Sequence, residues 1–273
     1  MSAAAASVPP AATSFAEATA VARSGAGRYE THVSEAFAFG GAPNGGYLLA
    51  TLLRAAVAET AHAHPLLASV EFARVARTGP AQVAVEVLRT GRSLSSARAT
   101  LSQDGDPVAE ALVTVATLAP GEPLRWSAPA PQIAPLDDCP LAQSAQEGLA
   151  RQLELRFDPA ADGWRAGRPS GRPEARAWFR LRHPTEPDPY VLALAADALP
   201  PVTVNVGLRG WAPTVRLTWQ LRALPAPGWL AVHAHGRAVS ERWFDEDVEI
   251  WDAEGRLVAQ SRQLALVPRR HTT

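Results

Sequence analysis

The sequence has a single cysteine and no marked excess of either charge. Because Cys139 stands alone among 273 residues, no disulfide can form within the chain, and a reducing compartment is the simple expectation. The 26 basic and 27 acidic residues leave a net charge of −1. This balance argues against a nucleic-acid-binding protein, which usually carries a clear basic excess. It leaves open a negatively charged small ligand, for which a local basic patch is enough.

Long apolar runs and a targeting signal are also missing. The longest apolar runs fall well short of the roughly 20 residues that a membrane span needs. The alanine-rich N-terminus lacks the basic start and the long apolar centre of a signal peptide. We therefore expect a soluble cytoplasmic protein that does not bind membranes. Chain ends are commonly loose, so we expect residues 1–26 to be disordered and 269–273 to form a tail.

Hydrophobic residues make up 47 % of the sequence, enough for a sizeable core in one large domain or two small ones. Periodicity divides the chain into two similar groups of elements. The first group comprises a strand over 28–39, an apolar helix over 47–61, and strands over 66–77, 80–93, 94–103 and 108–118.

Residues 121–147 carry several prolines and little periodicity, which indicates a linker. Beyond the linker the order of elements recurs. Its helix is expected to start at an Asp188 N-cap with Pro189 in the first turn, and to end at Pro200 and Pro201. The second group comprises strands over 151–159 and 174–183, a helix over 188–201, and strands over 214–223, 228–239, 244–252 and 256–267.

The two groups also resemble each other in sequence. The segment "DGDPVAEALVTVA" (104–116) matches "AEGRLVAQSRQLALV" (253–267), and residues 69–80 match 214–225. We therefore interpret the chain as an internal duplication. The repeated unit is a strand, an apolar helix and four antiparallel strands.

A helix that is apolar on almost every side needs a sheet curled around it, and the helix over 47–61 has only Arg54 and Glu59 as exceptions. This predicts an α+β fold, a double hotdog, in which two tandem antiparallel sheets are each wrapped around a buried helix. The first hotdog is expected at 27–120 and the second at 148–268.

The stretch "PNGGYLLATLLRAA" (43–56) places Asn44, Gly45 and Gly46 directly before an apolar run. Asn-Gly often forms a hairpin turn, but the composition of the run that follows favours the start of a helix. Free amides at a helix start form a partial positive pole, and the missing side chains let a ligand approach. We therefore expect substrate binding here, with amides polarising a carbonyl oxygen. The alternative is that glycine only allows tight contact between helix and sheet.

Three segments resemble the thioesterase-like double-hotdog superfamily, in particular the acyl-CoA thioesterase II type. They are "PNGGYLLATLLRAA", "ALAADALPP…GWAPTVRLTWQLRALPAPGWLAV" and "IWDAEGRLVAQSRQLALV". The resemblance implies hydrolysis of acyl thioesters of coenzyme A or a carrier protein, a place in lipid metabolism, and no cofactor or metal. In that family an Asp, a Thr and a Gln hold the attacking water, at positions that match Asp197, Thr214 and Gln263. The Thr aligns with Pro213 or Thr214, and Thr214 is chosen for its hydroxyl.

Asp197 also stands out without the resemblance, as the only ionisable residue in "YVLALAADALPP". Burial there would raise its pKa, which suits a general base, whereas the alternative is a solvent-facing Asp near a helix end. Thr214 by itself would be an ordinary strand residue. Gln263 shares a strand face with Ser261 and Ala265, where its amide can both donate to water and accept from it. The alternative is a solvent-facing Gln.

Other polar groups carry weaker signals. His233 and His235 lie on one face of an expected strand, but no third metal ligand stands out. Four arginines can meet the phosphates of coenzyme A or simply face solvent: Arg74, Arg77, Arg89 and Arg92. Two other functions stay open, a hydratase on the same fold and an acyl-ligand binding protein without turnover. We also expect a homo-oligomer.

Overall fold

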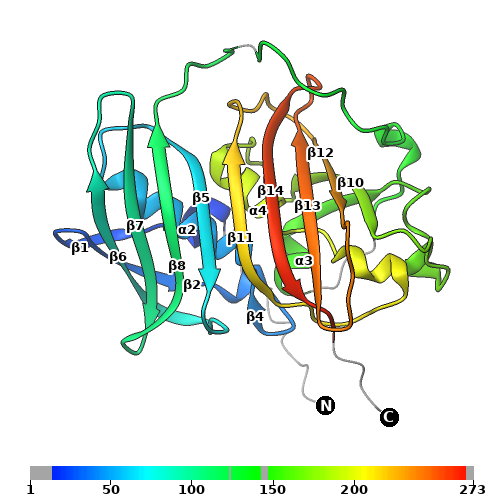
Figure 1. Ribbon diagram of the computed structural model, residues 1–273, viewed down its shortest axis with the longest axis horizontal. Helices are drawn as coiled ribbons and strands as arrows, with labels where there is room; N and C mark the ends of the chain where they lie inside the picture. The colour runs from blue at the N-terminus through cyan, green and yellow to red at the C-terminus, as the bar shows by residue number, and fades with distance from the viewer. Residues whose placement is uncertain (1–13, 123, 143–146, 269–273) are drawn as a thin grey trace, which may run out of the picture.

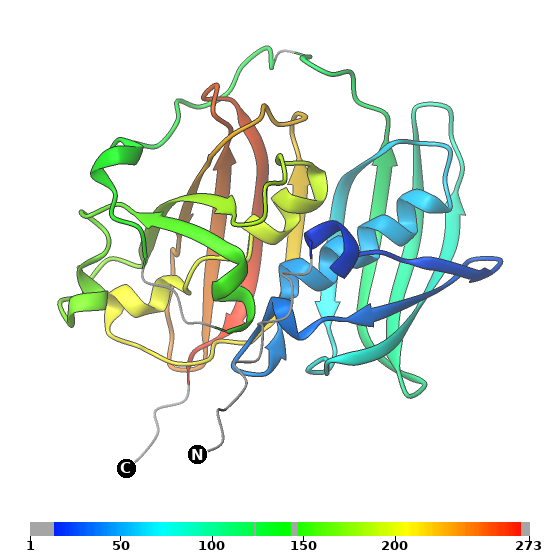
Figure 2. The ribbon, with the colours of Figure 1, turned by 180° about the vertical axis from the view of Figure 1, so that it is seen from behind.

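Twelve antiparallel strands form one curved sheet, and the α-helices lie against one of its faces (Figures 1 and 2). The computed structural model describes residues 14–122, 124–142 and 147–268. A mostly antiparallel sheet with few helices is an α+β fold, as the sequence predicts. Among the described residues, no helix has the length and apolar character needed to cross a bilayer.

The first half of the chain holds α1 (Phe15–Ala18), β1 (Ala22–Gly25), β2 (Arg28–Val33), η1 (Glu35–Phe37), β3 (Ala38–Phe39), β4 (Ala42–Pro43), α2 (Gly45–Ala58), β5 (His64–Phe72), β6 (Gly79–Arg89), β7 (Leu94–Gln103) and β8 (Asp106–Ala116). The rest holds η2 (Leu136–Asp138), α3 (Gly148–Gln152), β9 (Leu153–Phe157), η3 (Gly163–Ala166), β10 (Glu174–Leu181), α4 (Pro189–Ala195), η4 (Val202–Val206), β11 (Thr214–Leu221), β12 (Leu230–His235), β13 (Trp243–Trp251) and β14 (Leu257–Leu266).

The strand order repeats between the two halves. From the centre of the sheet outward, the first half runs β5, β8, β7, β6, β2, β1, and the second runs β11, β14, β13, β12, β10, β9. Strands that match in sequence thus take matching places, β8 with β14 and β5 with β11. The two expected sheets join edge to edge, because β5 and β11 pair along their length, for example Val70 with Leu217. This pairing satisfies backbone groups that would otherwise form two exposed edges.

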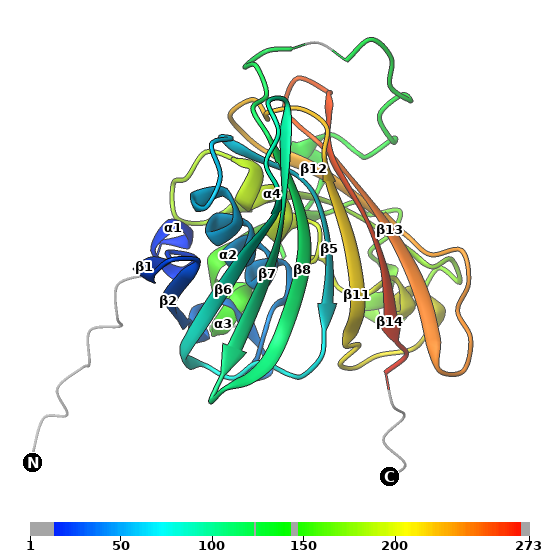
Figure 3. The same cartoon turned by 60° about the vertical axis from the view of Figure 1, so that its left-hand side comes forward.

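The two central helices pack against each other and are covered by the sheet (Figure 3). Helix α2 is buried along most of its length and contacts β5, β6, β7 and β8. The predicted helix start is confirmed. Asn44 is the N-cap, and its Oδ1 accepts a hydrogen bond of 2.9 Å from the Tyr47 N–H.

Helix α4 begins as predicted but ends early. The Asp188 carboxylate caps it by accepting from the N–H groups of Tyr190 and Val191, with Pro189 at the first position. The helix stops at Ala195 rather than reaching Pro200. A proline lacks the N–H for the helical bond and clashes with the preceding turn, so the backbone must leave the helix before it. Asp197 therefore lies in the turn after α4.

The N-terminal segment from residue 14 to residue 26 is ordered, which corrects the expected disorder over 1–26. Ser14 and Glu17 form a capping box around α1. The Phe15 ring is buried with its centroid 5.3 Å from that of Phe37. Burial of this one aromatic side chain anchors a segment that is otherwise poor in large apolar residues. Residues 1–13 and 269–273, on which the rest of the expectation falls, lie outside the described residues.

The expected linker packs on the outer face of the second half as it crosses between the halves (Figure 1). Leu124 and Ile133 contact a small apolar cluster that contains Trp251, and the Trp178 indole N–H donates to Ala134 O at 2.9 Å. The linker also contains the short η2 helix. Residues 123 and 143–146 of the linker lie outside the described residues.

Candidate active site

Asp197 meets the N-terminus of α2, which comes from the other half of the chain. The Gly46 N–H donates to Asp197 Oδ2 at 3.0 Å. Asn44 Nδ2 donates to the same oxygen at 2.9 Å and to the Asp197 backbone carbonyl at 2.7 Å. Because Asn44 Oδ1 also caps α2, both ends of this side-chain amide are used. The turn after α4 and the start of α2 therefore hold the Asp197 carboxylate in one place.

The surroundings of Asp197 raise its affinity for a proton. Burial raises its pKa from 3.8 to about 6, against the opposing effect of the Gly46 and Gly45 amides and the Asn44 side chain. The residue as a whole is nevertheless only partly buried. A carboxylate with a pKa near 6 is suited to take a proton at neutral pH.

The two glycines at the start of α2 are required for close approach. A Cβ at Gly46 would lie 2.5 Å from Ala193 O and 3.0 Å from Leu194 Cα, so α2 and α4 could not pack as they do. A Cβ at Gly45 would lie 2.9 Å from both Asp197 Oδ2 and the Phe72 ring. The sequence predicts that these amides face a substrate carbonyl, whereas in the structure the Gly46 amide donates to Asp197. The close packing of α2 against α4 is thus one reason why residue 46 is a glycine.

A second set of polar side chains lies on the inner face of the second half. Thr214 Oγ1, at the start of β11, donates to Gln263 Oε1 on β14 at 2.7 Å. Gln263 Nε2 donates to Glu246 Oε1 on β13, also at 2.7 Å. Glu246 Oε2 accepts from the Val202 N–H at 2.9 Å. The structure thus joins two residues of the predicted triad, Thr214 and Gln263, and adds Glu246.

The alternation expected for the last strand is confirmed. Ser261, Gln263 and Ala265 are buried, whereas Leu264 is 44 % exposed. A polar amide therefore points inward while a leucine faces solvent, the reverse of what hydrophobicity alone would favour. The inward position of Gln263 indicates a role beyond solvation of the strand.

Glu246 is a buried acid that the sequence reasoning missed. It is 3 % exposed and lies between the buried Phe244 and Val248 on the inner face of β13. Burial raises its pKa to about 7, and the charge of Asp197 contributes in the same direction, so the two carboxyl groups sense each other. The signal was present in "FDEDVEI", where alternation places Glu246 with the apolar residues.

The histidines and arginines noted in the sequence lie away from this site. His233 and His235 point to the outer face of β12, and His233 Nε2 lies 3.0 Å from Glu174 Oε1. Arg74 and Arg77 pair with exposed aspartates of the β7–β8 turn. No cluster of three metal-ligating side chains occurs among the described residues.

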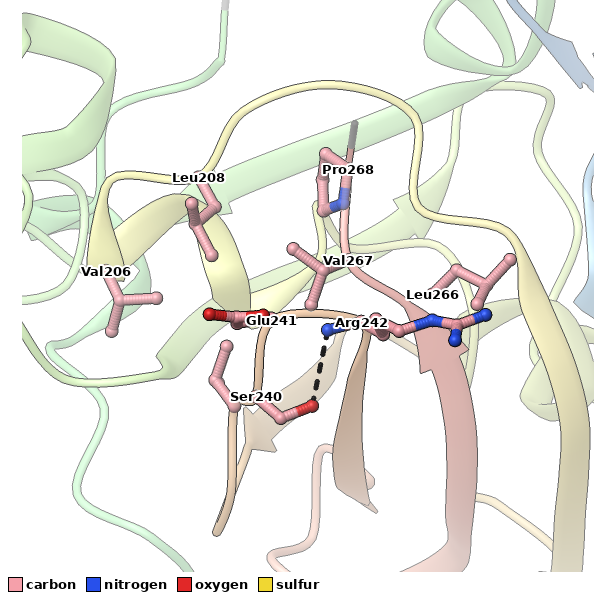
Figure 4. A pocket seen from close by; sticks show the side chains of 9 residues that line it. Val206, Leu208, Ser240, Glu241, Arg242, Leu266, Val267 and Pro268 are labelled. Atoms are coloured by element: carbon pink, nitrogen blue, oxygen red, sulfur yellow. Dashed lines mark hydrogen bonds between the residues drawn. The ribbon is translucent and has the colours of Figure 1, made fainter. Parts of the chain in front are cut away.

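A surface pocket of about 1220 Å³ opens beside the end of β14 (Figure 4). Its walls include Val206, Leu208 and Val267, with Glu241 and Arg242 at its polar side. The pocket lies next to the Thr214 region in space, because the N–H of Leu266, one of its lining residues, donates to Pro213 O. None of the four site residues Asp197, Thr214, Glu246 and Gln263 lines this pocket, so it does not define where chemistry occurs.

Comparisons with known proteins identify the family of the chain. Residues 33–116 match the acyl-CoA thioesterase N-terminal domain family, and residues 122–267 match the acyl-CoA thioesterase C-terminal domain family. The uncharacterized protein Rv0499 of Mycobacterium tuberculosis is 31% identical, over 88% of this chain and 91% of that protein.

Solved structures are similar over nearly the whole chain. A Thermobifida fusca protein with a provisional thioesterase II assignment is 40% identical, with a TM-score of 0.90, and covers 96% of this chain and 99% of its own. A hot dog fold protein of unknown function from Alicyclobacillus acidocaldarius is 25% identical, with a TM-score of 0.82 and coverage of 93% and 98%. Since the two family matches together span most of its length, the chain belongs to the acyl-CoA thioesterase family.

Proposed function

We propose that this protein hydrolyses acyl thioesters of coenzyme A or of a carrier protein, with Asp197 as general base. The single observation that best supports this is the Asp197 carboxylate, held at the N-terminus of α2 with a pKa that burial raises to about 6. Thr214 and Gln263 orient the attacking water through their hydrogen bonds. Their contact at 2.7 Å on the inner face of the second half supports a shared role.

We also propose that the fold is a double hotdog, as in the family to which the chain belongs. The repeated strand order around the pair α2 and α4 fits two tandem hotdog units joined at β5 and β11. In this interpretation residues 27–120 form the first unit, 121–147 the linker and 148–268 the second unit. The site then lies where the two units meet, since Asn44 and Asp197 come from different units.

The reaction needs one proton transfer in each direction. Asp197 takes a proton from water as the water oxygen bonds to the thioester carbon. The carbonyl oxygen gains negative charge near the N-terminus of α2, where the partial positive pole of the helix stabilises it. The C–S bond then breaks, and the proton on Asp197 passes to the leaving sulfur. Asn44, Gly45 and Gly46 hold the Asp197 carboxylate in this scheme, and their expected role in substrate binding rests on the partial positive pole of the helix.

The proposal needs neither a metal nor a redox cofactor and no covalent intermediate. It places the protein in acyl-lipid metabolism in the cytoplasm as a homo-oligomer. Light scattering on the protein as it elutes from a size-exclusion column measures the mass of the assembly directly. A mass equal to that of one chain would contradict the proposed homo-oligomer.

Release of free thiol from acyl-CoAs of graded chain length tests the function. We expect turnover by the wild-type protein and at least a hundredfold loss with Asp197→Asn. A hydratase would alter the acyl group and leave the thiol bound. A binding protein would melt at a higher temperature with acyl-CoA and show no turnover. Either result would refute thioester hydrolysis.

A further inference from the structure

The Gln263 side chain is held at both ends, in a chain of hydrogen bonds that starts from a backbone amide. The Val202 N–H donates to Glu246, Glu246 accepts from Gln263, and Gln263 accepts from Thr214. The three contacts measure 2.9, 2.7 and 2.7 Å. Val202 and Glu246 are buried, so water does not compete for these groups.

The chemistry of the groups fixes the direction of this chain. A backbone N–H can only donate, and the Glu246 carboxylate can only accept when it is ionised, which is the case above its pKa of about 7. Gln263 must therefore turn its NH₂ toward Glu246 and its oxygen toward Thr214. The Thr214 hydroxyl must then give its hydrogen to Gln263. Its oxygen keeps free lone pairs, so toward the site Thr214 is an acceptor.

Direction matters for an attacking water. The water must point a lone pair at the thioester carbon and both hydrogens elsewhere. Asp197 can accept one hydrogen and the Thr214 oxygen can accept the other. If the chain ran in the opposite direction, the Thr214 O–H would donate to the water instead of accepting from it, so the second hydrogen of the water would lose its acceptor and the attacking lone pair would no longer be oriented.

We propose that Glu246 is a positioning residue, which sets the direction of the hydrogen bonds through Gln263 so that the Thr214 oxygen accepts from the attacking water. This inference rests on the proposed function. A buried acid at this place opposes folding, since burial and the charge of Asp197 both disfavour its ionised form. Retention of a group that costs stability is typical of function.

Glu246→Gln separates this role from a structural one, because it keeps size and the number of hydrogen bonds. The Val202 N–H still needs an acceptor, so the new amide must turn its oxygen to Val202 and its NH₂ to Gln263. Gln263 then presents its NH₂ to Thr214, and the chain is reversed. We expect kcat to fall about 10²-fold with KM nearly unchanged. The variant should melt at or above the wild-type temperature at neutral pH, because a buried acid has been removed.

A double variant that restores the direction provides the rescue. With Glu246→Gln and Gln263→Glu together, the carboxylate at position 263 accepts from both neighbours, and the Thr214 hydroxyl again donates to it. We expect kcat to recover to within about tenfold of wild type on the high-pH plateau. Asp247→Asn, on the solvent-facing side of the same strand, is the matched control and should leave kcat unchanged.

Wild-type kcat in Glu246→Gln, or no recovery in the folded double variant, would overturn the assignment while leaving thioester hydrolysis intact. A wild-type protein without turnover would refute the proposed function instead. The contact of the Gln263 NH₂ with Glu246, on which the direction of the chain depends, is then tested by NMR on the Gln263 side-chain amide, identified by its loss in Gln263→Glu. This signal should move as Glu246 titrates near neutral pH in wild type and stay fixed in Glu246→Gln. A signal that does not move in wild type would also overturn the assignment.

Discussion

Replacement of Asp197 by Asn should raise stability and lower activity at neutral pH. The substitution keeps the size of the side chain, and its remaining oxygen can still accept from Gly46 and Asn44. What it removes is the negative charge. The wild-type pKa of about 6 lies above the ordinary 3.8, so the folded protein binds the proton more tightly than the unfolded chain does. The ionised carboxylate therefore opposes folding.

The magnitude follows from the size of this shift. About two pKa units at 1.36 kcal/mol each correspond to about 3 kcal/mol. Because Asp197 is only partly buried, solvent screens the charge, and we expect about 1–3 kcal/mol of added stability. The difference should appear as pH rises from about 4 through 6, and it should vanish below pH 4, where both proteins are neutral at this position. Loss of a general base should lower kcat about 10²–10⁴-fold.

Urea unfolding at pH 8 and pH 3.5, together with thiol release, measures both effects. Asp245→Asn is the matched control on β13. Burial opposes ionisation of Asp245, but the N–H groups of Ala238 and Arg237 and the charge of Arg262 lower its pKa overall. Its charged form therefore favours folding, and its neutralisation should reduce stability at neutral pH without loss of activity. An active Asp197→Asn protein would remove this residue from the mechanism. A variant much less stable than wild type at pH 8 would make Asp197 a structural anchor.

Three further outcomes are expected. The wild-type kcat should fall as pH drops through about 7 and then about 6, the pKa values of Glu246 and Asp197, because both carboxylates act in their ionised forms, and a profile flat down to pH 4 would contradict the general-base role. Gly46→Ala should lose about 1–3 kcal/mol in thermal or urea unfolding, because its Cβ would lie 2.5 Å from Ala193 O, and unchanged stability would show that the helices shift freely. Fragments 1–125 and 145–273, expressed separately, should aggregate because each exposes a central strand edge, and two soluble fragments with sharp melting transitions would refute this.

Much of the local structure could be predicted from the sequence because local rules decide it. Asn44 and Asp188 carry the short polar side chains that cap helices, and both caps are present in the structure. The alternation in β14 placed Gln263 inward before any contact was known. The ends of elements were less predictable. Helix α4 ends before Pro200 and Pro201 are reached. The alanine-rich composition of the first residues did not indicate that the buried Phe15 would anchor α1.

The site depends on the tertiary structure. Asn44 and Asp197 are 153 positions apart, and no local pattern states that the start of α2 meets the turn after α4. The amides of Gly45 and Gly46 could be predicted to be free, but only the approach of α4 shows that Asp197 takes the Gly46 amide. Glu246 could be predicted to face inward, but only the pairing of β13 with β14 shows that it meets Gln263. The sequence alone thus determined the elements and their buried faces, because these depend on neighbouring residues. The partners of the polar groups were decided by tertiary structure, because they depend on which distant surfaces the apolar core brings together.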